Sequence, residues 1–438
     1  MLAGSYGSGV YPGGGAPGYN VRTRESYCGR LQGACVGALF GLVLFFASFP
    51  VIFWNEQRAV AEYEALGESE RLCVDGGDAG VAPSERLNGR LIRLHGAVSG
   101  ASLRDATIGG IGVNNALELQ RHVEVYSPTE GSHTTSRRGQ MGASERVTTY
   151  TYGTAWVSSP VDSSRFHDPT QRRPPVRWPV TDTTLRAQRP ALGKWTLART
   201  AVDKLVSGSL RSIDAADLLD APRGTAAIAR NGDESEANSV TLSTSKLGTL
   251  VPSNGALYTS ASPAQPVVGD VRITYTAAEA PASATVVGLA DSTSGSLREF
   301  HTPGTGHTII LAARGNLSVA QMFDRARAES ARLTWALRGG GWLMAVVGVL
   351  LMLQPAALAP EWVPLIGGLL GSAAQCAVGL MALSIGTSTT SAAMAAAWLA
   401  ARPAMAAAIA AVAIVSALLP MCARRYRQAQ PLSCPHSD

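Results

Sequence analysis

The sequence predicts a multi-span α-helical membrane protein with a large β-rich domain that also contains helices, an α+β arrangement. Residues 34–54 carry no charge and are long enough to cross a bilayer, which takes about 20 apolar residues. A second apolar block, residues 341–421, is interrupted by few charged residues. Between these blocks lies a mixed-polarity segment of roughly 285 residues, which is long enough to bury its own core.

The N-terminal end of the chain predicts a tail and a retained membrane anchor. Residues 1–30 begin with a stretch rich in Gly, Pro, Ser and Tyr, so we expect a disordered tail there. Residues 34–54 form the first predicted span. This run is too long for the apolar region of a cleavable signal peptide, and no small-residue cleavage site follows it. It is therefore predicted to stay in the chain.

The C-terminal apolar block divides into further spans. Pro360-Glu361 and Arg402-Pro403 interrupt it, because proline breaks a helix. The predicted spans are residues 341–359, 375–400 and 404–422, followed by a basic tail at 423–438. Residues 362–401 hold either one span or two short spans around residues 387–391. We prefer one, which gives four spans in all.

Arginines at both ends of the chain predict its orientation. Those before the first span are Arg22, Arg24 and Arg30, and those after the last are Arg424, Arg425 and Arg427. Positive charge favours the cytoplasmic side, so both termini are predicted to face cytoplasm or nucleoplasm and the large domain the lumen. The arginines at 325, 327, 332 and 338 oppose this orientation, although long translocated domains escape the rule.

The domain at residues 55–316 shows the alternation and the β-branched residues typical of strands. The predicted strands are residues 89–95, 117–126, 146–158, 270–276, 284–290 and 307–312. Residues 196–219 are predicted to be partly helical and 160–190 a long loop. Residues 317–338 predict an amphipathic helix that leads into the second span. This helix either packs on the β domain or lies on the membrane or on a partner.

Polar residues directly after the first span form the candidate membrane-interface motif. Its members are Trp54, Asn55, Glu56 and Arg58. Glu56 and Arg58 can anchor lipid headgroups or contact the large domain, whereas Trp54, with Trp342 and Trp362, suits an aromatic belt. Simple interfacial anchoring and a specific docking role both remain open for this motif.

Three residues are candidates for covalent modification. Asn316 begins the sequon Asn-Leu-Ser, which predicts a glycosylation site if that segment is luminal. Cys28 and Cys422 flank membrane segments and are candidates for palmitoylation, with a role as small apolar fillers as the alternative.

Signatures of catalysis and of metal or cofactor binding are absent from the sequence. It contains no GxxxxGK[ST] loop, no HExxH and no CxxC, and its histidines are scattered. We therefore predict no enzyme activity, no catalytic or metal-binding residues and no cofactor. The formal charge is +5 and the arginines form no long run, so we expect no nucleic-acid partner. A channel or transporter is the alternative function, although the spans hold few ionisable groups.

An ordered series of motifs carries a resemblance to a known family. Residues 53–60, FWNEQRAV, resemble the FWNEGRAV signature of the transmembrane protein 43 family, also called LUMA, with Gln57 in place of glycine. Further similar segments follow in the family's order: LQRHVEVY at 119–126, TYTYGTAW at 149–156, VGDVRITY at 268–275, residues 323–342 and AWLAARP at 397–403.

This resemblance implies a four-span protein of the endoplasmic reticulum and inner nuclear membrane with a luminal domain. It also implies a scaffold in nuclear-envelope organisation that associates with lamins, emerin-type proteins or further copies of itself. We therefore expect nuclear-envelope or endoplasmic-reticulum proteins and a homo-oligomer as partners, besides the membrane lipids that the interface motif can contact. The partners are not determined by the motifs, because this chain differs from the family in its Gly/Tyr-rich tail, its Gly/Ser-rich insertions and Gln57.

Overall fold

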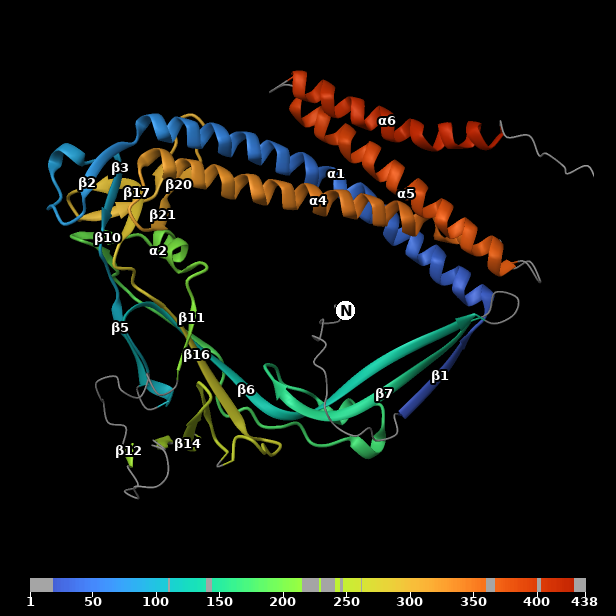
Figure 1. Ribbon diagram of the computed structural model, residues 1–438, viewed down its shortest axis with the longest axis horizontal. Helices are drawn as coiled ribbons and strands as arrows, with labels where there is room; N and C mark the ends of the chain where they lie inside the picture. The colour runs from blue at the N-terminus through green and yellow to red at the C-terminus, as the bar shows by residue number, and fades with distance from the viewer. Residues whose placement is uncertain are drawn as a thin grey trace, which may run out of the picture.

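The computed structural model combines long apolar helices with a β-rich domain, which confirms the predicted α+β membrane fold. It describes residues 19–108, 111–138, 144–214, 228–229, 241–244, 247–260, 262–359, 367–399 and 403–428. The helices are α1 Tyr27–Leu72, α2 Arg199–Val206, α4 Val319–Leu358, α5 Gly367–Trp398 and α6 Pro403–Gln428. In Figure 1, α1, α4, α5 and α6 form a bundle, and the strands lie to one side of it and below.

Two large sheets and a two-stranded one build the described part of the domain. The strands of the first sheet are β1 Tyr19–Glu25, β5 Ala101–Asp105, β6 Ile111–Arg138, β7 Ser144–Val157, β8 Thr183–Arg186, β11 Arg211–Ile213, β12 Ile228–Ala229, β13 Thr241–Thr244, β14 Gly248–Ser253, β15 Ala256–Tyr258 and β16 Val271–Glu279. Those of the second are β2 Val74–Asp78, β3 Leu91–Gly96, β4 Val98–Ser99, β9 Ala191–Leu192, β10 Trp195–Leu197, β17 Ala284–Asp291, β18 Ser296–Arg298 and β21 Leu311–Arg314. The short sheet pairs β19 Phe300–His301 with β20 Thr308–Ile309.

Each large sheet is packed on its own apolar cluster. In the first sheet, alternate residues of β6 and β16, such as Val123 and Ile273, are buried together. In the second, Trp195 and Leu94 are buried beside α2. This alternation follows from the period of two in a strand, which sends successive side chains to opposite faces. Each of the six predicted strand segments overlaps an observed strand, and the last of them, residues 307–312, overlaps two, β20 and β21.

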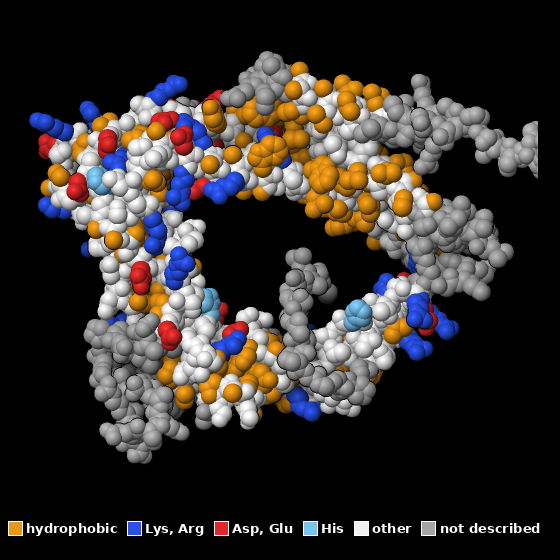
Figure 2. Space-filling view, viewed as in Figure 1, with side chains coloured by type: hydrophobic (Ala, Val, Ile, Leu, Met, Phe, Trp, Pro, Cys, Tyr) orange, Lys and Arg blue, Asp and Glu red, His pale blue; other side chains and the backbone are white. Residues whose placement is uncertain are grey.

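Within the described part of the chain, three helices are long and apolar enough to cross a membrane: α1, α4 and residues 373–398 of α5. A shorter apolar stretch, residues 406–418, lies in α6. Figure 2 shows hydrophobic side chains gathered over these helices and charged ones over the domain end. Large side chains on α1 such as Phe40 and Phe46 are each 60% exposed, which suits contact with lipid rather than water.

The described part of residues 362–401, where the sequence allows one span or two, forms the single helix α5. The polar run at 387–391 does not interrupt it, because hydroxyl groups bond within the helix. Thr390 Oγ1 donates to the carbonyl oxygen of Gly386 at 2.7 Å, one turn earlier. Trp362 and Arg402 lie outside the described residues.

Two element boundaries differ from the sequence expectation. The predicted start of the domain, residue 55, falls inside α1, which continues to Leu72 because its outer half packs on α4. There Ala65 and Leu66 are buried with Phe323. The second difference is β1, which occupies residues 19–25 of the expected tail and pairs with β7. Residues 1–18 and 429–438 of the two predicted tails lie outside the described part.

The expected helix at 317–338 and the second span form one helix, α4. Ser318 caps its start: the Ser318 hydroxyl accepts the N–H of Gln321, and the Gln321 side chain accepts the N–H of Ser318. Met322 and Phe323 are buried against the β domain, whereas Leu333 is 49% exposed. The helix therefore packs on the domain at its beginning and leaves it further along.

Glycines allow α1 and α4 to approach closely, and this generates a prediction. A methyl group at Gly41 would lie 2.6 Å from the carbonyl oxygen of Gly348, whereas one at Gly37 would meet nothing within 4 Å. We predict that Gly41→Ala lowers the free energy of unfolding by about 1–3 kcal/mol through overpacking. Gly37→Ala, one turn away, leaves it unchanged or slightly raised. Thermal unfolding in detergent, followed by circular dichroism, compares the two variants, and equal midpoints would contradict this packing.

Candidate functional site: a buried carboxylate where three helices meet

The interface motif lies on α1 just beyond its apolar part, and its residues face different ways. Trp54 points outward and is 60% exposed, whereas Asn55 and Glu56 are 0% and 1% exposed. A helix turns about 100° per residue, so neighbouring positions face different surroundings. The motif thus presents an aromatic ring to the boundary and polar groups to α4.

Glu56 is held by groups from two other helices. Arg338 of α4 donates from Nε to Oε1 and from Nη2 to Oε2, both at 2.7 Å. The indole Nε1 of Trp398, near the end of α5, donates to Oε2 at 2.6 Å. The forked guanidinium matches the carboxylate geometry, which makes this pairing both strong and directional. A single carboxylate therefore links α1, α4 and α5.

The adjacent residues of the motif extend this contact along α4. Asn55 Nδ2 donates to the carbonyl oxygen of Thr334 at 3.2 Å. Arg58 Nη2 donates to the Thr334 hydroxyl at 3.1 Å, and Arg58 Nη1 pairs with Glu62 at 2.6 Å. We call the six residues Asn55, Glu56, Arg58, Thr334, Arg338 and Trp398 the clasp.

The chemistry of the clasp is that of a structural joint. The charge of Glu56 is neutralised by Arg338, and both its oxygens accept hydrogen bonds. Sliding one helix past the others would leave Glu56 or Arg338 without its partner, and a buried unpaired charge is costly near a bilayer. The contact therefore holds the three helices in one register. Among the described residues, no cluster of three His, Cys, Asp or Glu side chains has the arrangement of a metal site.

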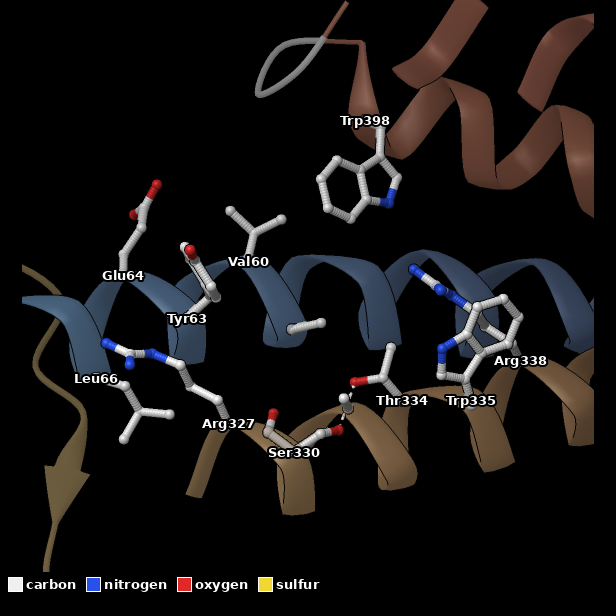
Figure 3. A pocket seen from close by; sticks show the side chains of 12 residues that line it. Val60, Tyr63, Glu64, Leu66, Arg327, Ser330, Thr334, Trp335, Arg338 and Trp398 are labelled. Atoms are coloured by element: carbon white, nitrogen blue, oxygen red, sulfur yellow. Dashed lines mark hydrogen bonds between the residues drawn. The ribbon is translucent and has the colours of Figure 1, made fainter. Parts of the chain in front are cut away.

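A pocket of about 340 Å³ lies beside the clasp, between α1, α4 and Trp398 (Figure 3). Its lining is mainly apolar and aromatic, with two arginines and one glutamate. The lining residues are Ala59, Val60, Tyr63, Glu64, Leu66, Arg327, Ser330, Ala331, Thr334, Trp335, Arg338 and Trp398. The guanidinium carbon of Arg338 lies 4.8 Å from the centre of the exposed Trp335 ring, a cation–π contact. Such a mixed lining suits an amphipathic group.

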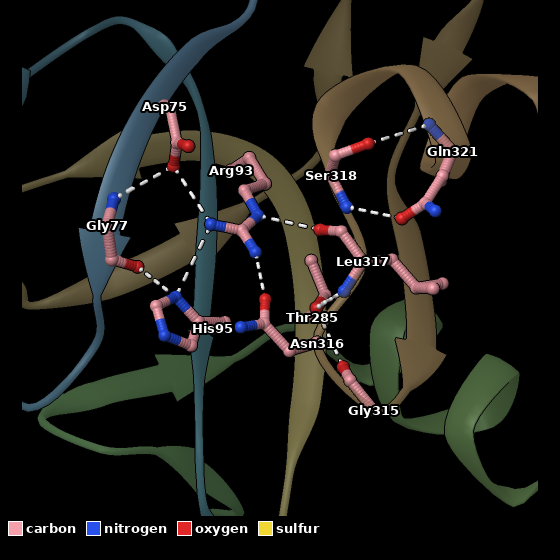
Figure 4. A network of polar contacts seen from close by, with 10 residues as sticks. All are labelled: Asp75, Gly77, Arg93, His95, Thr285, Gly315, Asn316, Leu317, Ser318 and Gln321. Carbon is pink, nitrogen blue, oxygen red and sulfur yellow. Dashed lines mark hydrogen bonds and ion pairs between the residues drawn. The ribbon is translucent and has the colours of Figure 1, made fainter.

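A second polar network fixes the start of α4 to the domain (Figure 4). Its centre is Arg93 of β3, which is 6% exposed. Arg93 Nε donates to the carbonyl oxygen of Leu317 at 2.9 Å, Nη1 to Asp75 at 3.0 Å, and Nη2 to Asn316 Oδ1. The hydrogen bond from the N–H of Gly77 lowers the pKa of Asp75 most, and the bond from the Arg93 guanidinium lowers it further.

Thr285 completes this network from the next strand. Its hydroxyl accepts the N–H of Leu317 at 3.0 Å and donates to the carbonyl oxygen of Gly315 at 2.8 Å. The segment leading into α4 is thereby tied to β3 and β17. Together with the clasp, these bonds join the sheet rigidly to the membrane helices.

The candidate modification residues lie apart from the clasp. Asn316 is exposed in the segment before α4, although its side-chain oxygen is engaged by Arg93. Cys28 is exposed in the first turn of α1. Cys422 belongs to α6, and its side chain is outside the described part. The structure tests neither modification.

Sequence reasoning gave no role to Arg338, Thr334 or Trp398 in this site. One signal was present: Glu56 follows the first span by two residues, and Arg338 precedes the second by three. Consecutive antiparallel spans bring such positions to the same level of the membrane. The contact of Trp398 had no comparable signal, because it depends on how α5 packs.

Breaking the clasp should destabilise the protein strongly. We predict that Glu56→Ala or Arg338→Ala lowers the free energy of unfolding by about 3–5 kcal/mol, because each leaves the other charge unpaired. Glu329→Ala is the control. It removes an exposed pair with Arg325 on the same helix as Arg338 and should cost less than about 0.5 kcal/mol. Thermal unfolding in detergent measures all three, and a loss at Glu56 no greater than the control's would show that the clasp carries little stability.

Comparison with known proteins identifies the family. A family model described as Transmembrane protein 43 matches residues 125–403. Transmembrane protein 43 of Rattus norvegicus is 29% identical over 403 residues, covering 89% of this chain and 90% of the relative. That of Homo sapiens is 28% identical over 410 residues, covering 91% and 92%. The Drosophila melanogaster homolog is 25% identical over 322 residues, covering 71% and 75%. No solved structure matches the chain. Because the model spans more than half of the sequence, this chain belongs to the transmembrane protein 43 family.

Proposed function

We propose that this protein is a non-catalytic membrane scaffold of the endoplasmic reticulum and inner nuclear membrane. In this role it contributes to nuclear-envelope organisation through protein partners and self-association. It crosses the membrane four times, with both termini in the cytoplasm or nucleoplasm and the domain in the lumen. Its partners are membrane lipids, proteins of the same membranes and further copies of itself.

The clasp is the main observation that supports the proposed four-span topology. Glu56 and Arg338 lie at the domain ends of the first two spans, and Trp398 joins them from the C-terminal end of α5. If α4 leads away from the domain side, α5 returns to it, and α6 is free to leave again as the fourth span. If α6 crosses as proposed, the number of crossings is even, which agrees with the arginines at both ends of the chain.

The scaffold role is supported by what the polar groups of the clasp and network do. The charged residues described above bond to other elements of the same chain, and they join a broad sheet surface to the bilayer. The pocket beside the clasp and the outward Trp54 and Trp335 supply the aromatic, amphipathic surface that lipid contact requires. The luminal sheets would then be displayed to partners at a fixed angle.

The channel or transporter alternative gains no specific support from the helices. The Ser416 backbone carbonyl oxygen accepts the hydroxyl of Ser384, and the hydroxyl of Thr387 accepts the indole N–H of Trp342 at 3.1 Å. These bonds join helices together, which is the usual role of such groups in membrane bundles. We therefore propose no transport function.

Engineered glycosylation tests compartment and topology together. In an Asn316→Gln background, Ser292→Asn creates a sequon in the turn between β17 and β18, a position where Asn is well tolerated. We predict a glycan there that endoglycosidase H removes, because the domain faces the lumen. A sequon tag appended after Asp438 should stay unmodified.

The reverse pattern, with a glycan on the tag and none at position 292, would overturn the proposed orientation. Imaging of a tagged chain provides the second control. Signal in the endoplasmic reticulum and at the nuclear rim is expected. Signal confined to the plasma membrane or to mitochondria would contradict the proposed location.

A further inference from the structure

The outer edge of the second sheet lies in a slot between two helices. Strand β21 pairs with β17, and within the described part of the chain it has no strand on its other side. Both α2 and α4 contact β21 (Figure 1). Ala312 packs against the apolar cluster that includes α2, whereas Leu311 and Ala313 pack with Met322 of α4. The two helices therefore cover opposite faces of the sheet and leave the strand edge between them.

A pocket of about 230 Å³ occupies this position, and we call it the edge slot. Residues 311–313 of β21 line it, together with Lys204 from α2 and with Arg325, Glu329 and Arg332 from α4. The charged side chains come from both helices, and the strand edge lies between them. The edge slot therefore combines an accessible backbone with charged groups on two sides.

The backbone of Ala312 offers hydrogen bonds to the edge slot. In an antiparallel pair, alternate residues of a strand bond to the neighbouring strand and the residues between them face away from it. The N–H of Gly315 donates to the carbonyl oxygen of Ser283, so residues 311, 313 and 315 bond toward β17. Ala312 therefore directs its N–H and its C=O away from β17. A donor and an acceptor on one residue of a strand edge are what an added strand pairs with.

The charges of the edge slot favour an acidic occupant. Lys204 and Arg332 are exposed, and within the described residues neither has an ion-pair partner. Arg325 pairs with Glu329 at 3.3 Å. Three cations and one carboxylate line the slot, which leaves a net charge of +2. Successive side chains of a strand point to opposite faces, so two neighbouring acidic residues would meet Lys204 on the α2 side and Arg332 on the α4 side.

The edge slot lies too far from the bilayer to take a lipid headgroup. The predicted second span begins at Gly341, nine residues after Arg332 and sixteen after Arg325. At 1.5 Å per residue these side chains are attached about 14 Å and about 24 Å from that level along α4. The headgroup layer is only about 5–8 Å thick on each side of the bilayer. A small anion also fits less well than a peptide, because the carbonyl oxygen of Ala312 would repel it.

We propose that the edge slot binds an acidic, extended segment of a partner protein, which pairs with β21 as a further strand of the second sheet. The proposal rests on the proposed function, because it specifies the kind of segment that the scaffold would hold on its domain. Backbone bonds at Ala312 supply affinity that is independent of sequence, and Lys204 and Arg332 select acidic side chains. Because β21 has four residues, the bound segment is short.

Fluorescence anisotropy with the full-length chain in detergent tests this site. The probe is the fluorescein-labelled peptide TVTEEVTV, and TVTKKVTV is the control peptide. We expect saturable binding of the acidic peptide and no binding of the basic one. Lys204→Glu and Arg332→Glu should each weaken binding at least about fivefold, because an attraction becomes a repulsion. Lys194→Glu, an exposed position outside the slot, changes the net charge equally and should leave binding unchanged.

Two further variants separate strand addition from simple charge attraction. Ala312→Pro removes the outward N–H and keeps every charge, and proline is tolerated on an edge strand where the N–H faces away from the ladder. It should weaken binding by about fivefold or more, because the added strand loses a hydrogen bond. Its thermal unfolding shows whether the fold is kept, and if it is not, the charge reversals decide. Glu329→Gln removes the only carboxylate that lines the slot and should strengthen binding.

Three results would overturn the proposal: no saturable binding of the acidic peptide, equal binding of the basic one, or a folded Ala312→Pro variant that binds as tightly as the parent. Displacement of the peptide by inorganic phosphate at matched ionic strength would assign the slot to a small anion and overturn it too. These failures leave the proposed function standing, because imaging and glycosylation test it separately. If the peptide binds but the chain is confined to the plasma membrane, the slot stands and the proposed function falls.

Discussion

The arrangement of the whole protein depends on one ion pair, that of the buried Glu56 with the half-buried Arg338. It lies where α1 and α4 leave the apolar layer, and Trp398 brings α5 to the same point. Hydrophobic burial does not register helices within a lipid phase, since lipid tails are as apolar as the side chains. Directional bonds must do so, and the bidentate guanidinium supplies them. The glycine contact of Gly41 with Gly348 then sets how closely α1 and α4 approach.

Helix α4 connects this ion pair to the β domain. α4 runs without interruption from the clasp to Ser318, where the capping box and the Arg93 network fix its start against β3 and β17. A displacement of the sheet would therefore be transmitted to the membrane helices. This rigidity is what the proposed scaffold role requires.

Much of the fold could be predicted from the sequence, because apolar runs and alternation are local properties. Charge-free runs indicate membrane helices, and the alternating residues of β6 and β16 indicate strands. The length of α1 could not be predicted, because residues 55–72 remain helical through packing on α4 rather than through an apolar pattern. The pairing of β1 with β7 could not be predicted either, because it joins residues more than a hundred positions apart.

Only part of the candidate site could be predicted from the sequence. Polar residues after a span, Glu56 above all, stand out by position, but Arg338 lies 282 residues further on and Trp398 342. No local pattern links such groups, and a surface role at the lipid headgroups explained Glu56 equally well before its burial was known. Arg93 and Thr285 gave no signal, because arginine and threonine in strands are common.

A double-mutant cycle tests the central claim most directly. Glu56→Gln, Arg338→Gln and the double variant are compared with the parent chain by unfolding in detergent. If the two side chains form the joint that holds the helices in register, their coupling energy should be about 2–3 kcal/mol, and the double variant should be far less damaged than the sum of the single ones. Additivity within about 0.5 kcal/mol would show that Glu56 and Arg338 act independently, and the clasp would no longer account for the arrangement of the three helices.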